Sequence, residues 1–189
     1  MSNMIQKPTS LPSLNVHAEG NGIAVGYTDS VSSTFNVILT GESGKRREIS
    51  RDYYNLIIGY DPFPSDRIVV DPSRALTEYI SDEVKEKFGG WNEEAIERIK
   101  KLPAIISMER DKSAEQQAVF AFIKDIRRQE SGIKVYFQKY YPIPLSLLWD
   151  NMRELSMYQF EFTRTHWTIK NIDILEVLQD AGAYMFPGK

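Results

Sequence analysis

Residues 159–180, QFEFTRTHWTIKNIDILEVLQD, bring aromatic, cationic, acidic and imidazole side chains into one short span. Apolar and polar residues alternate over 157–162 and again over 165–170, which is the period of half-buried strands. Asp173 then precedes an apolar run of helical spacing, and Glu176 follows three residues later, at the spacing of a capping box. The stretch therefore predicts a strand, a turn, a second strand and a helix.

The segment before this stretch admits two interpretations. Residues 113–129 fit a helix, because apolar side chains recur there at positions i, i+3, i+4 and i+7, but they also contain a continuous apolar run. Turn residues at 130–132 lead directly into an alternating strand at 133–141, so we favour a β-hairpin. Pro144 then begins a helix. Together these elements predict a mixed C-terminal strand-helix-strand-helix unit.

Two helices are predicted in the middle of the chain. The first runs from Pro72 to Phe88, with Asp71 as its N-cap, and apolar residues recur along it at helical spacing. Asn92 caps the second helix, which is short and stops before a proline. Upstream, residues 53–60 are apolar on both faces and predict a buried central strand. The centre of the chain is thus a strand followed by a helical pair.

The N-terminal part predicts β-structure after a polar, proline-containing tail. Residues 14–28 suggest a short hairpin and 33–40 a better strand, which together form an N-terminal antiparallel β segment. The fold class predicted for the whole chain is α+β. We expect a flexible tail at 1–13 and a single domain at 14–187, with a sub-boundary near 61–72 as the alternative.

Composition excludes several kinds of site. The 189 residues include no cysteine, which removes disulfides, thiol nucleophiles and cysteine-based zinc sites. The only two histidines, His17 and His166, lie far apart in the sequence, and we expect neither a metal nor a cofactor. Lysine and arginine number 23 against 26 acidic residues, so nucleic acid would need a local basic patch. No apolar run is long enough for a membrane helix, and we expect a cytoplasmic protein.

The first candidate site lies on the second strand of the quoted stretch. One face of that strand carries four polar side chains: Arg164, His166, Thr168 and Lys170. Three of them are potential cations that suit a phosphate or a carboxylate, and Glu161 or Asp173 could orient the imidazole. The alternative is a solvated strand face in which His166 belongs to a structural hydrogen-bond network.

The second candidate site lies on the strand 133–141. Its apolar face is expected in the core: Ile133, Val135, Phe137 and Tyr141. The opposite face carries a row of cationic, aromatic and amide side chains: Lys134, Tyr136, Gln138 and Tyr140. Lys134, Tyr136 and Tyr140 are residue types on which single-stranded bases stack and phosphates bind. The alternative is an ordinary exposed β face, because tyrosine favours strands in any case.

Three functional hypotheses follow. The leading one is a non-catalytic recognition or interaction module that binds a protein, a second copy of itself or an anionic ligand through the C-terminal strand face. The second is an enzyme acting on a phosphate-containing substrate, with His166 as general acid or base and with Arg164 and Lys170 binding the anion. The third is a single-stranded nucleic-acid-binding domain that uses the row on 133–141.

Overall fold

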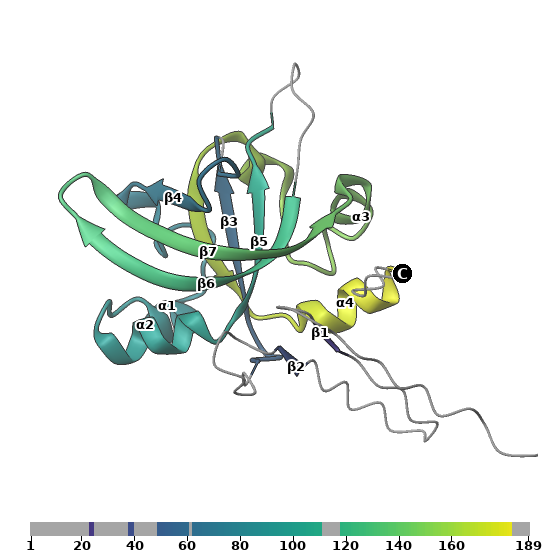
Figure 1. Ribbon diagram of the computed structural model, residues 1–189, viewed down its shortest axis with the longest axis horizontal. Helices are drawn as coiled ribbons and strands as arrows, with labels where there is room; N and C mark the ends of the chain where they lie inside the picture. The colour runs from purple at the N-terminus through teal and green to yellow at the C-terminus, as the bar shows by residue number, and fades with distance from the viewer. Residues whose placement is uncertain (1–22, 25–37, 40–48, 61, 111–117, 183–189) are drawn as a thin grey trace, which may run out of the picture. The chain divides into compact units, whose positions relative to one another are not determined.

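The computed structural model describes residues 23–24, 38–39, 49–60, 62–110 and 118–182 (Figure 1). The chain divides into two units, Met1–Arg47 and Glu48–Lys189. In the first unit, β1 (Ile23–Ala24) pairs antiparallel with β2 (Ile38–Leu39). The tail expected at 1–13 lies outside the described residues, as do most of 14–28 and 33–40.

The second unit is built on a six-stranded mixed sheet, in the order β4-β7-β6-β5-β3-β8 (Figure 1). Only the pair β3–β5 is parallel, and every other neighbouring pair is antiparallel. The strands are β3 (Tyr54–Gly59), β4 (Arg67–Val70), β5 (Pro103–Met108), β6 (Ala118–Gln129), β7 (Gly132–Ile143) and β8 (His166–Lys170).

Helical segments are interspersed among these strands, and the predicted α+β fold class is confirmed. The α-helices of the described residues are α1 (Asp82–Phe88), α2 (Glu93–Lys100), α3 (Leu145–Asp150) and α4 (Ile174–Asp180). Two short 3₁₀ helices are η1 (Pro72–Arg74) and η2 (Gln159–Thr163). None of these helices is long and apolar enough to cross a lipid bilayer.

Alternate residues of the strands enter two buried layers. On one face, α1 and α2 contribute side chains such as Phe88 and Ile99 to a core that includes Ile57 of β3 and Trp167 of β8. The neighbours of Ile57 on β3 point to the opposite face. There the hydroxyl of Tyr54 donates a hydrogen bond of 2.6 Å to the carbonyl of Leu155, which follows α3. The central strand predicted at 53–60 is β3, whose residues Tyr54–Gly59 are all buried and which lies between β5 and β8, whereas Tyr60 is 75% exposed.

The hairpin favoured for 113–141 is confirmed from residue 118 onward as β6 and β7, and 113–117 lie outside the described residues. Gly132 begins β7 with φ +136°, and a Cβ there would stand 2.9 Å from the carbonyl oxygen of Val70, so only glycine suits this position. Register shifts where Phe120 faces Tyr141 and Ala121 faces Lys139, which leaves Tyr140 as an extra residue on β7. The bulge corrects one prediction, because Tyr141 stacks on Phe120 instead of continuing the core face of Phe137.

The helix predicted from Pro72 to Phe88 is wrong over its first half. Asp71 caps only the short η1, and Leu76 and Tyr79 have positive φ values of +57° and +55°. The α-helix begins after Ser81, whose side chain caps it. Segment 75–80 runs instead along the outer edge of β8, where the amide of Leu76 donates to the carbonyl of Trp167 at 2.8 Å. Tertiary pairing with an edge strand overrides the local helical pattern.

The strand predicted at 157–162 is also wrong, because η2 occupies this position. The Glu161 carboxylate accepts a 2.7 Å hydrogen bond from the amide of Tyr158 and so closes a tight turn. Tyr158 and Phe160 are exposed, whereas Phe162 is buried, so the three rings do not share the single face that alternation predicted. Strands β4 and β5 were not predicted, and the proline that begins β5 was interpreted only as a helix stop.

Leu76→Ala should destabilise the second unit by about 2–5 kcal/mol, because the Leu76 side chain is only 2% exposed and lies in the core. Ile80→Ala is the control, because Ile80 belongs to the same segment but is partly buried at the margin of that core. We expect a clearly smaller loss in the free energy of unfolding for Ile80→Ala, measured by equilibrium urea denaturation. Equal losses would show that segment 75–80 does not anchor the core through Leu76.

Candidate functional site

The β8 face that carries His166, Thr168 and Lys170 is buried. On one side β8 pairs with β3, and on the other segment 75–80 covers its outer edge. The hydroxyl of Thr168 donates to the carbonyl of Tyr79 at 2.9 Å, and the Lys170 ammonium lies 3.4 Å from the same oxygen. This strand face therefore belongs to the interior of the second unit, where its polar groups contact protein atoms.

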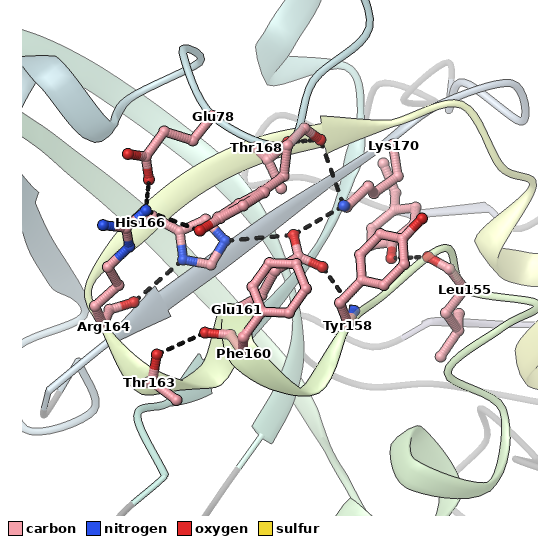
Figure 2. A network of polar contacts seen from close by, with 12 residues as sticks. Glu78, Leu155, Tyr158, Phe160, Glu161, Thr163, Arg164, His166, Thr168 and Lys170 are labelled. Carbon is pink, nitrogen blue, oxygen red and sulfur yellow. Dashed lines mark hydrogen bonds and ion pairs between the residues drawn. The ribbon is translucent and has the colours of Figure 1, made fainter.

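Glu161 stands at the centre of a buried ionic network (Figure 2). Its Oε1 atom lies 2.8 Å from the ammonium nitrogen of Lys170, and its Oε2 atom accepts from the amide of Tyr158. Both side chains are almost fully inaccessible, with Glu161 at 0% and Lys170 at 6% exposure. A buried carboxylate and a buried ammonium each need a partner of opposite charge, and Glu161 and Lys170 are each other's partner.

His166 lies between a backbone carbonyl and the same carboxylate (Figure 2). Its Nδ1 atom is 3.1 Å from the carbonyl oxygen of Arg164, and its Nε2 atom is 3.6 Å from Oε1 of Glu161. The second distance is too long for a hydrogen bond, so Nε2 has no hydrogen-bond partner among the described residues. The ring of Tyr79 packs edge-on against the imidazole at 5.3 Å between centroids. The imidazole is enclosed on all sides.

The surroundings of Glu161 shift two pKa values. Burial by itself would raise the pKa of Glu161, but the adjacent His166 and Lys170 together with the Tyr158 amide lower it overall. The pKa of Tyr54, which is also buried, is raised well above its usual value by desolvation and by the negative charge of Glu161. The network consequently favours an ionised Glu161 beside a neutral tyrosine.

Arg164 and Asp173, the other members of the predicted anion site, have partners of their own. The guanidinium of Arg164 pairs with the carboxylate of Glu78 and donates to the hydroxyl of Tyr79 at 2.8 Å. Asp173 caps α4 and forms an ion pair with Arg51 at 2.6 Å. The structure thus brings Glu161, His166 and Lys170 together, places the Arg164 side chain beside Tyr79, and puts Asp173 at a helix start.

A pocket and an aromatic surface lie over this network, and the sequence did not predict them. The stacked rings of Tyr158 and Phe160 are 56% and 50% exposed, and Tyr79 packs edge-on against Phe160. We call these three residues the aromatic surface. Beside it is a pocket of about 430 Å³, lined by Tyr79, Ile80, Ser81, Val84, Ser156, Tyr158, Ile169, Lys170 and Asn171. The density of aromatic residues at 158–162 was the available signal, but a strand interpretation assigned it to the core.

The second candidate row is divided by the bulge in β7. Lys134 and Tyr136 face Val69 and Arg67 of β4, and both are partly exposed. Tyr140 is displaced from them by the register shift and packs edge-on against Phe122, with ring centroids 5.6 Å apart. Lys134 and Tyr136 therefore share a surface that Tyr140 does not extend in a regular row.

Metal-binding side chains do not cluster in the described ranges, where no group of three or more acidic or histidine residues is placed to hold an ion. Comparison with known proteins yields no matching family model, no matching curated protein and no matching solved structure.

Glu161→Gln should destabilise the protein by about 3–5 kcal/mol at neutral pH, because it leaves the buried Lys170 ammonium without a counter-charge. The folded-state pKa of Glu161 is lowered, so its contribution is present above the unfolded pKa of about 4.3 and is lost as the pH falls through the folded value. The stability difference between the wild type and Glu161→Gln should shrink below about pH 4.3 in urea unfolding.

The control is Glu86→Gln, because Glu86 is an exposed carboxylate on α1. The free energy of unfolding of the Glu86→Gln variant should equal that of the wild type at every pH. A Glu161→Gln deficit that stays constant down to strongly acidic pH would contradict the ionised carboxylate.

Proposed function

We propose that this chain is a non-catalytic recognition module that binds a segment of a partner protein on the aromatic surface and in the adjoining pocket. The observation that carries the proposal is the pair of stacked, half-exposed rings of Tyr158 and Phe160 beside a 430 Å³ pocket. Large exposed aromatic side chains are characteristic of binding surfaces, and the pocket volume is in the range of ligand sites.

The ionic network supports this proposal by holding the aromatic surface in one conformation. The carboxylate of Glu161 fixes the Tyr158 amide and is itself held by Lys170. On the other side of Phe160, Arg164 connects Glu78 to the hydroxyl of Tyr79. A surface that is rigid before binding loses less conformational entropy when a partner binds. The buried charges are in this sense positioning groups for the exposed rings.

Charge around the pocket favours a protein segment over a phosphate-bearing ligand. Among the described residues that line the pocket, Lys170 alone is charged, and Glu161 neutralises it at 2.8 Å. The remaining lining is aromatic, aliphatic, hydroxyl or amide. Such a lining suits an apolar side chain flanked by peptide groups. The burial of His166 and Glu161 weighs against catalysis, because no substrate atom can approach them in this conformation.

The proposal can be tested with peptides selected on the wild-type chain from a displayed random library. We expect Tyr158→Ala and Phe160→Ala each to weaken a selected peptide by about 30-fold, because exposed aromatic anchors of an interface contribute about 2 kcal/mol or more. Fluorescence polarisation of the labelled peptide gives the dissociation constants.

Tyr60→Ala is the matched control, because Tyr60 is 75% exposed and is not among the residues of the aromatic surface or the pocket lining. It should leave peptide affinity unchanged. Failure to select any peptide would overturn the proposal. Selected peptides whose affinity is insensitive to both substitutions in the aromatic surface would do the same.

A further inference from the structure

A second surface, separate from the aromatic surface, lies on strands β4, β7 and β6. Ile68 on β4, Val135 on β7 and Ile126 on β6 belong to the core beneath these strands. The alternate residues therefore point outward. Figure 1 shows β4 beside the closed end of the β6–β7 hairpin. Three strands side by side thus offer one continuous outward face.

Strand register arranges the outward residues of this face in two rows. The first row crosses the three strands through Arg67, Tyr136 and Asp125. The next row consists of Val69, Lys134 and Arg127. We call these six residues the hairpin face. Val69 is 44% exposed, which is high for a valine in a strand, so this face is open. It carries three cations and one carboxylate.

Two of these cations lack a counter-charge. Arg127 pairs with Asp125 at 2.6 Å, but no carboxylate of the described ranges pairs with Arg67 or Lys134. Both flank Tyr136, one across the β4–β7 pair and the other two residues before it on β7. The Arg127 guanidinium lies 5.0 Å from the centroid of the same ring. This face is therefore marked by an aromatic ring with three cations and one carboxylate beside it, and two of the cations have no ion-pair partner in the described ranges.

We propose that the hairpin face binds single-stranded nucleic acid. Arg67 and Lys134 bind backbone phosphates, and a base stacks on the Tyr136–Arg127 pair. Single-strand sites combine these two features, because cations follow the backbone and every base has a flat face to stack. The overall charge of −3 does not oppose this, since the attraction is local and is screened over about 10 Å at ordinary salt.

An acidic peptide is the competing ligand for a basic face. Tyr136 favours nucleic acid, because the ring lies beside the cations and acidic side chains have no aromatic ring to stack on it. The two ligands differ in a measurable way. Binding by charge alone depends on Arg67 and Lys134, whereas binding of bases depends on the aromatic ring of Tyr136 as well.

The test measures binding of a fluorescent oligothymidylate of about twelve nucleotides to the full chain at about 50 and about 200 mM salt. Arg67→Gln and Lys134→Gln should each weaken binding and reduce the salt slope by about 0.7. Tyr136→Ala should weaken binding at least about fivefold at both salt concentrations, and Tyr136→Phe should retain it. Lys85→Gln, at an exposed lysine of α1, is the control and should have no effect.

Polyglutamate and inorganic polyphosphate are measured in parallel. Weaker binding of both than of the oligonucleotide, with loss of oligonucleotide affinity in Tyr136→Ala, supports the proposal. No oligonucleotide binding at low salt overturns it. Equal binding of polyglutamate, or equal oligonucleotide affinity of the wild type and Tyr136→Ala, also overturns it. Thermal melting shows whether Tyr136→Ala is folded, and the exposed Arg67→Gln tests the same face without altering the core.

Discussion

The burial of Lys170 on an edge strand is the constraint on which the candidate site depends. An ammonium group removed from water needs a charge partner, and Glu161 supplies it at 2.8 Å. To reach Lys170 the chain turns into η2, and the second carboxylate oxygen of Glu161 closes that turn at the Tyr158 amide. The turn directs Tyr158 and Phe160 outward. One internal ion pair thereby determines which aromatic residues the protein exposes at this surface.

The same edge explains why local sequence patterns predicted some elements and missed others. The β6–β7 hairpin and α2 follow from turn residues and capping that act within a few residues, so the sequence suffices for them. Segment 75–80 has helical spacing, yet it pairs with β8. That strand lies far from the segment in the sequence, since Ala75 pairs with Trp167. Apolar and polar residues do alternate at 157–162, but the Tyr158 amide donates to the Glu161 carboxylate and the segment forms a 3₁₀ helix. Long-range contacts decided both cases.

Candidate side chains were easier to identify from the sequence than their exposure. Glu161, His166 and Lys170 were grouped by spacing, and the structure brings them within contact distance. Spacing cannot tell whether a polar strand face meets water or a covering segment, and here residues 75–80 cover the edge. Arg164 is equally close in sequence, yet its charge is matched by Glu78, which comes from that covering segment. The partners that neutralise these cations are distant in sequence and so were not predictable.

The two surfaces proposed for binding also differ in whether carboxylates neutralise their cations. Beside the pocket, a carboxylate accompanies each cation, so little net field is left to attract an anion and apolar contact must supply the affinity. On the hairpin face, Arg67 and Lys134 keep their charge at the surface, where a phosphate can approach. With an overall charge of −3, this local excess of positive charge would be lost in any average over the chain. The position of the cations without an ion-pair partner, more than their number, is therefore the reason for proposing a different ligand for each surface.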